Sequence, residues 1–204
     1  MHLEPFGWNV VVVGAWNRAI FTPAWIGKNI FNLPEGTPFP IEIPIHARAP
    51  WRIRHEQVAV LVGDNSLEIT VDACDFTTLD KARQFAKRAL AELPRTPLSA
   101  TGYNVRYGSA EATPEFAGLF GESLDRCIGT AGLTVSDRLA RRTVPFENGV
   151  INLEAVLKSS NHAVFQANFH MDSEDAEELT GWLDIPISRI EETVNSLLAA
   201  LPGD

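Results

Sequence analysis

Apolar and polar residues alternate with a period of two along much of this chain. Strict alternation over 151–157 and 163–171 predicts two neighbouring antiparallel strands that turn one apolar face toward a core. Apolar and β-branched runs predict further strands at 8–13, 51–55, 58–62, 67–71, 98–107 and 133–144. Residues 41–45 predict an edge strand, because Pro44 has no amide hydrogen to donate.

Helical spacing of apolar residues is clearest between Leu79 and Leu93, which predicts a helix capped by Thr77 or Thr78. Three other helical regions are predicted. The first begins at Thr22-Pro23 and ends near Phe31, and the second begins at Thr113-Pro114 and carries apolar residues from Phe116 to Ile128. The third is capped by Ser173 and is rich in acidic residues in its first turn. Pro186 interrupts it before a segment from Ile190 to Leu201.

Two pairs of segments resemble each other within the chain. VVGAWNRAIFTPAWIG at 12–27 aligns without a gap with YNVRYGSAEATPEFAG at 103–118, and LAELP at 90–94 matches LAALP at 198–202. The sequence therefore predicts an α+β fold with a tandem pseudo-repeat of strand, helix, antiparallel strands and helix. The repeat units are residues 1–97 and 98–204, either separate or fused into one domain. Two layers are expected, with helices packed on an antiparallel sheet.

Composition restricts the partners that we expect. The 204 residues carry 17 Lys and Arg against 26 Asp and Glu, a net charge of −9 that disfavours nucleic acid and anionic membrane surfaces. The apolar run near the N-terminus is far shorter than the roughly 20 residues of a membrane helix. Cys74 and Cys127 show neither zinc spacing nor disulfide density, so we predict a cytoplasmic protein without a metal or another cofactor.

Sequence motifs for common chemistry do not occur in this chain, which has no GxGxxG, GxxxxGK[ST], HExxH, GxSxG or CxxC. The five histidines are scattered, and no two have the spacing that places a metal pair on one helical face. His170 and Asp172 fall on one side of a strand end, where a carboxylate can orient a general-base imidazole. A surface or packed histidine is the simpler interpretation.

Arginines recur at comparable places in the two predicted units. Arg48, Arg52 and Arg54 precede one strand, and Arg138, Arg141 and Arg142 precede another. Because guanidinium groups match carboxylates and phosphates, a candidate ligand-binding groove between the units is predicted. Its residues are Arg52, Arg54, Arg141 and Arg142. The alternative is a solvated sheet face on which these arginines pair with nearby acids.

The chain also resembles a set of uncharacterised bacterial proteins. The resemblance rests on an Asn...Ile-Phe-x-Pro-x-Trp segment and a later Thr-Pro...Gly-x-Asn segment. The matching residues are Asn17, Ile20, Phe21, Pro23 and Trp25, followed by Thr96, Pro97, Ala100, Gly102 and Asn104. The resemblance implies no activity, cofactor or site residue.

These observations favour a non-catalytic binding or assembly subunit over an enzyme. We expect a homo-oligomer or a protein partner, bound through a sheet edge or a helix face. The alternative is a binding protein or enzyme for a small anionic molecule, with its site between the two units and His55 or His170 as base. Nucleic-acid binding ranks last, because neither arginine stretch carries interleaved aromatic residues.

Overall fold

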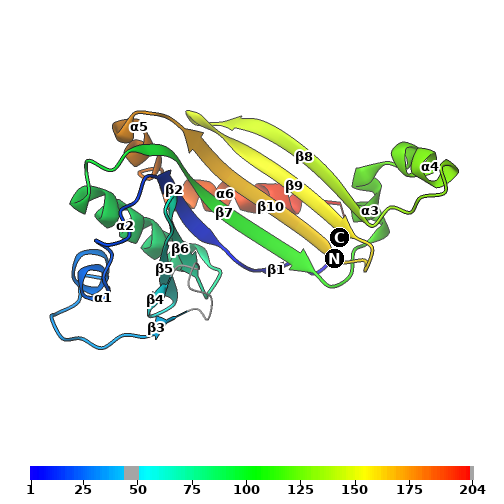
Figure 1. Cartoon of the computed structure of the whole chain (residues 1–204). Helices are drawn as coiled ribbons and strands as arrows, with labels where there is room; N and C mark the ends of the chain where they lie inside the picture. Colours follow the sequence, from blue (N-terminus) through cyan, green and yellow to red (C-terminus); the bar gives the residue numbers. More distant parts are fainter. Residues whose placement is uncertain (44–50, 203–204) are drawn as a thin grey trace.

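The computed structural model describes residues 1–43 and 51–202, which form an α+β fold with helices packed on one antiparallel sheet (Figure 1). The sheet has ten strands in the order β3-β4-β5-β6-β2-β7-β10-β9-β8, and β1 pairs with β7 beside this path. Of the predicted strand at 41–45 the described part is β3, Ile41–Glu42. Pro44, Ile45, His46 and Arg48 lie outside the described residues.

The predicted order of elements holds, and several boundaries move. The first half contains β1 (Glu4–Pro5), β2 (Asn9–Gly14), α1 (Pro23–Trp25) continued by the π-helical turn Ile26–Ile30, β3, β4 (Arg52–His55), β5 (Val58–Val62), β6 (Ser66–Val71) and α2 (Phe76–Glu92). The second half contains β7 (Leu98–Ser109), α3 (Pro114–Ala117), the 3-10 turn Gly118–Phe120, α4 (Ser123–Thr130), β8 (Asp137–Phe146), β9 (Gly149–Lys158), β10 (Ala163–Asp172), α5 (Ala176–Trp182) and α6 (Ile187–Ala199).

The Thr-Pro helix starts are confirmed, since Thr22 Oγ1 accepts from the Trp25 amide and Thr113 Oγ1 accepts from the Phe116 amide. Two predicted caps are wrong. Asp75, rather than Thr77 or Thr78, caps α2, and Asp175, rather than Ser173, caps α5. In both cases an extended residue directly before the helix offers a carboxylate oxygen to an amide of the first turn.

The helix predicted from residue 113 to 128 is also wrong as a single element. The chain turns at Gly121, whose φ of +62° is a left-handed conformation that suits glycine, and α4 follows as a separate helix. The strand predicted at 133–144 lies at Asp137–Phe146 as β8. It includes Pro145, which is tolerated because β8 ends the sheet.

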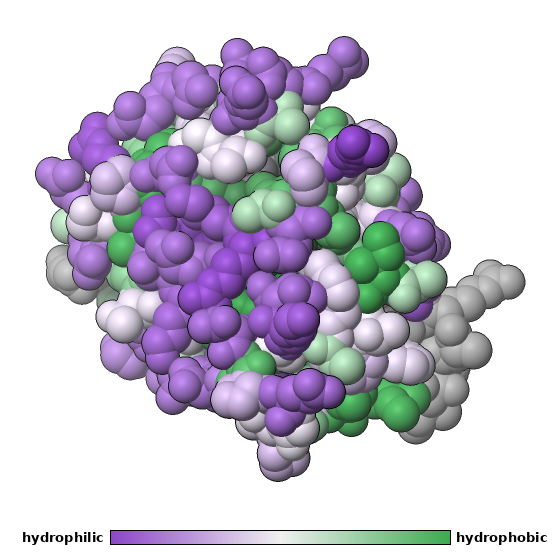
Figure 2. Space-filling model, turned by 90° about the vertical axis from the view of Figure 1, so that its left-hand side faces the viewer, coloured by the Kyte–Doolittle hydropathy of each residue, from purple (hydrophilic) through white to green (hydrophobic). Residues whose placement is uncertain are grey.

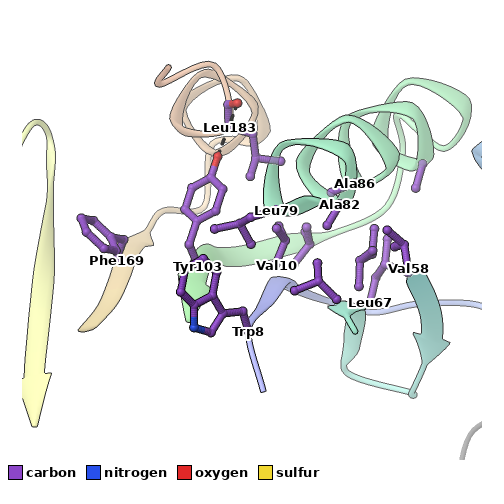
Figure 3. Packing of buried hydrophobic residues seen from close by; sticks show 14 of the residues in the cluster. Trp8, Val10, Val58, Leu67, Leu79, Ala82, Ala86, Tyr103, Phe169 and Leu183 are labelled. Carbon is purple, nitrogen blue, oxygen red and sulfur yellow. Dashed lines mark hydrogen bonds between the residues drawn. The ribbon is translucent and has the colours of Figure 1, made fainter. Parts of the chain in front are cut away.

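The apolar faces of the sheet and of α2, α5 and α6 form one core, shown close up in Figure 3. Trp8, Tyr103 and Phe169 are almost fully buried there. Trp8 Nε1 donates to the Arg106 carbonyl oxygen at 2.8 Å, and the Tyr103 hydroxyl donates to the Leu183 carbonyl oxygen at 3.5 Å (Figure 3). Burial raises the pKa of Tyr103 above its usual range, so this hydroxyl stays a donor.

The two halves share this sheet, because β2 pairs directly with β7 over Asn9–Gly14. In each half the first long strand also pairs with the last strand of that half: β2 with β6, and β7 with β10. Within residues 1–43 and 51–202, no helix is both long enough and apolar enough to cross a membrane.

Candidate interaction surface

The sheet face opposite α2, α5 and α6, here called the open face, carries a continuous row of paired residues. The register joins one residue from each of eight neighbouring strands: Arg54, Ala59, Thr70, Asn9, Asn104, Asn168, Asn152 and Thr143. Directly paired residues in antiparallel strands project from the same face. The row therefore crosses the open face from β4 to β8.

Four asparagines in the middle of this row form an amide ladder: Asn9, Asn104, Asn168 and Asn152. Successive Nδ2–H···Oδ1 bonds measure 2.7 Å from Asn104 to Asn9, 2.8 Å from Asn168 to Asn104, and 3.2 Å from Asn152 to Asn168. At the ends, Asn9 donates to Glu68, and the Thr143 hydroxyl donates to Asn152 at 2.8 Å. The ladder thus links β6 to β8 through side chains.

The ladder satisfies polar groups that the sheet partly removes from water. Asn9 is only 5% exposed, and each inner amide uses one donor and one acceptor within the ladder. Sequence reasoning missed these residues as a group. The available signal was an asparagine at a polar position of each alternating strand, as at Asn152 and Asn168, but only the register shows that they meet.

The four arginines predicted as ligand-binding residues do not lie together. Arg52 and Arg54 are on β4 and Arg141 and Arg142 are on β8, near opposite ends of the strand order. Six strands intervene, so β4 and β8 are seven strand spacings apart, which is about 34 Å along the sheet. Where the two halves meet, β2 and β7 form a hydrogen-bonded pair. The expectation of a shared arginine groove at that junction is therefore wrong in its geometry.

The individual arginines have local partners. Arg54 pairs with Glu42 at 2.9 Å and also with Asp72. Arg52 lies 4.0 Å from Glu42, and its buried Nε has no hydrogen-bond partner among the described residues. Figure 2 views the molecule from the α1 and α2 side, and hydrophilic residues dominate that face, with smaller hydrophobic patches beside them.

On β8, Arg141 shares the open face with its partner Glu154, whose Oε1 lies 3.5 Å from Arg141 Nε. Arg142 projects from the opposite face and donates to the Arg141 carbonyl oxygen at 2.6 Å. Whether either residue binds an anion remains a prediction.

His170 and Asp172 do come together, with Nε2 of His170 at 2.8 Å from Oδ1 of Asp172. They lie on β10, on the open face beside Gly102.

His55, the other predicted base, packs against Phe31, with 5.2 Å between the centroids of the two rings. Among the described residues, no group of three His, Cys, Asp or Glu is placed to hold a metal ion.

A pocket of about 420 Å³ lies beside α1 at the β4 and β5 end of the sheet. Apolar side chains of Phe21, Ile26 and Val60 line it, together with Trp51, which is 48% exposed. Among the described residues that line this pocket, Arg18 supplies a cationic group, and none of the four arginines predicted as ligand-binding residues lines it.

Four exposed leucines follow one another along the chain between α3 and the middle of β8. Their exposed fractions are 41% for Leu119, 68% for Leu124, 65% for Leu133 and 61% for Leu139. We call these four residues the leucine group. None of the residues of α4 is buried, and Figure 1 shows α4 projecting beyond the body of the sheet.

Strand β8, which contains Leu139 of this group, has a free edge. Among the described residues, its ten positions pair only with β9. A row of backbone donors and acceptors without a partner strand is a template for another strand.

Comparison with protein-family models finds no matching family, and comparison with curated proteins finds no match. The resemblance to uncharacterised bacterial proteins stays a prediction.

Proposed function

We propose that this protein is a non-catalytic binding or assembly subunit that works through the free edge of β8 and the adjoining leucine group. One observation carries the proposal: among the described residues, the ten-residue strand β8 is paired along one edge only, and it carries the last of four exposed leucines in the segment from residue 119 to residue 139. Isolated exposed apolar residues are ordinary, whereas a free strand edge with exposed apolar side chains is typical of an interaction surface.

The energetics favour covering this surface. Complete burial of a leucine side chain contributes about 1.5–3 kcal/mol, so a partner that covers even part of the leucine group gains several kcal/mol. The open face offers less, because its amides already bond to one another along the ladder.

We also propose that the chain is a tandem pseudo-repeat of residues 1–97 and 98–204. The arrangement of strands supports it, since each half has its first long strand beside its last one. Two details support the same offset of 91 residues as the aligned segments. Thr22 and Thr113 cap equivalent helices, and Glu56 and Glu147 begin two-residue hairpin loops with φ of 51° and 50°.

The experiment is sedimentation velocity of the wild-type chain and of a triple variant, Leu124→Lys, Leu133→Lys and Leu139→Lys, over a hundredfold range of concentration. A pull-down from cell extract with both proteins as bait runs in parallel. A matched control adds three lysines at exposed positions of α2 and α6: Ala91→Lys, Asn195→Lys and Ala199→Lys.

We expect the wild type and the control to associate with themselves or retain the same partner, and the triple variant to do neither. A wild type that stays monomeric at every concentration and retains the same proteins as the triple variant contradicts the proposal.

The pocket beside α1 favours small-molecule binding as the second candidate function. A small anion would contact Arg18 there, while Trp51 and Phe21 supply apolar surface. The test is a thermal-shift panel of carboxylates and phosphates on the wild type and on Arg18→Ala; equal shifts for both proteins would remove this candidate.

A further inference from the structure

The pairing of β8 with β9 determines which backbone groups of β8 face outward. Phe146 and Gly149 close a two-residue hairpin, so they form a hydrogen-bonded pair, and bonded pairs then alternate along the strands. Pro145, directly before Phe146, belongs to the set that does not bond to β9, as suits a residue without an N–H. Asp137, Leu139 and Arg141 belong to the same set.

These three residues form a pattern that is complementary to itself. Asp137, Leu139 and Arg141 occupy alternate positions of β8, so their side chains share the open face and their N–H and C=O groups face outward. When two copies of such a strand pair antiparallel about Leu139, each aspartate lies opposite an arginine and leucine lies opposite leucine.

We propose that a second copy of this chain pairs with β8 in this antiparallel register, so that the two sheets join into one across a two-fold axis at Leu139. This inference rests on the proposed assembly function and names its partner. The interface is isologous, because the same strand contributes to both sides. The three outward residues of each strand supply about six backbone hydrogen bonds.

Neighbouring charges support this register. In the monomer, Asp137 lies opposite Lys158, with 3.1 Å between the charged groups, and Arg141 lies opposite Glu154 at 3.5 Å. Pairing about Leu139 places Arg141 of the partner subunit next to Asp137. The row across the interface then reads Lys158, Asp137, Arg141 of the partner subunit and Glu154 of the partner subunit, with alternating signs. Opposite charges in directly paired positions stabilise a sheet.

Two neighbouring registers are less favourable. A shift that centres the pair on Arg141 places two arginines opposite each other, and a shift that centres it on Asp137 places two aspartates opposite each other. Like charges in paired positions destabilise a sheet. On the other face, the register centred on Leu139 sets Arg138 opposite Ala140, so no like charges meet there. Of the three registers centred on Asp137, Leu139 and Arg141, only the one centred on Leu139 therefore avoids like charges in paired positions.

The test is a charge exchange between copies. Arg141→Asp alone places aspartate opposite aspartate in a homodimer, and Asp137→Arg alone places arginine opposite arginine. When the two variants are mixed, one strand carries aspartates at both positions and the other carries arginines at both. Each of the two contacts in the mixed dimer therefore places an aspartate opposite an arginine. In sedimentation velocity at 50 mM salt, we expect the wild type at twice the 22.4 kDa chain mass. Each single variant should dissociate at least tenfold more readily, and the equimolar mixture should recover the dimer.

Two substitutions distinguish the edge of β8 from exposed apolar surface elsewhere. Leu139→Lys brings two lysines together on the axis and should abolish the dimer, whereas Ile43→Lys changes a similarly exposed apolar residue just after β3, at the other end of the strand order, and should leave it intact. Circular dichroism melting of each variant shows that it is folded.

This register is overturned if the dimer survives Leu139→Lys, or if mixing does not rescue the single charge variants. The assembly function still stands in that case if the leucine triple variant loses association. A wild-type chain that stays monomeric at millimolar concentration also overturns the inference. The pull-down then decides the assembly function separately, by whether a partner is retained by the wild type and lost by the leucine triple variant.

Discussion

Replacing Asn168 by Asp tests whether the amide ladder stabilises the fold. The two side chains have the same shape, but a carboxylate has no hydrogen to donate. Asn168 donates to Asn104 Oδ1 at 2.8 Å and accepts from Asn152 Nδ2 at 3.2 Å. The substitution keeps the second bond and turns the first into a contact between two acceptor oxygens.

The expected cost follows from these bonds. Losing one hydrogen bond and leaving its acceptor partly buried costs about 1–3 kcal/mol. A loss of about 2 kcal/mol in a chain of this size lowers Tm by about 4–8 °C. Asn148→Asp is the matched control, because Asn148 is exposed in the β8–β9 turn, and it should change the free energy of unfolding by less than about 0.5 kcal/mol.

The cost should depend on pH in a defined direction. Only the protonated carboxyl group can donate to Asn104, so the folded-state pKa of the carboxyl group introduced by Asn168→Asp lies above the unfolded value of about 3.9. The stabilisation from the protonated form is therefore complete below about pH 3.9 and is lost as pH rises through the folded pKa. Urea unfolding at pH 7 and pH 4.5 measures this; a deficit equal to that of the control, or one that grows on acidification, refutes the role of the ladder.

Three further substitutions test local features. Gly102→Ala should lower the free energy of unfolding by about 1–3 kcal/mol in urea titration, since its Cβ would stand 2.3 Å from a backbone oxygen of β10, whereas Gly118→Ala, with no atom within 4 Å, should be near neutral. Thr113→Ala should cost about 1 kcal/mol by removing the cap of α3, with serine restoring most of it in the same assay. Glu147→Gly should raise Tm slightly, because its φ of 50° costs a side chain about 1 kcal/mol and the exposed pair with Arg189 offsets less than that.

Local signals in the sequence predicted most elements. Alternation over 151–157 and 163–171 indicated β9 and β10, because a strand that buries one face must alternate. The Thr-Pro pairs marked the starts of α1 and α3, because capping depends on residues that are neighbours in the chain. The missed break at Gly121 is different, since glycine is compatible with both continuation and termination of a helix.

The candidate surface depends on contacts between distant residues, which local patterns do not encode. Asn9 and Asn104 meet because β2 pairs with β7, and this pairing also separates β4 from β8. The comparable sequence positions of the arginines predicted that they converge. The strand order instead places them near the two ends of the sheet. The free edge of β8 likewise follows from strand order alone.

The amide ladder and the edge of β8 should have separable effects, and this separation tests both roles together. The ladder satisfies side chains within one chain, so Asn168→Asp should lower stability and leave self-association unchanged once the protein is folded. The edge of β8 leaves outward backbone groups without a partner strand among the described residues and leaves Leu139 exposed, so Leu139→Lys should abolish association and leave the melting temperature of the monomer nearly unchanged. Each variant needs both measurements, sedimentation at 20 °C and thermal melting at a concentration where the wild type is monomeric. If Asn168→Asp weakens association as strongly as Leu139→Lys does, the open face itself takes part in binding, and the division between a self-satisfied face and an interacting edge fails.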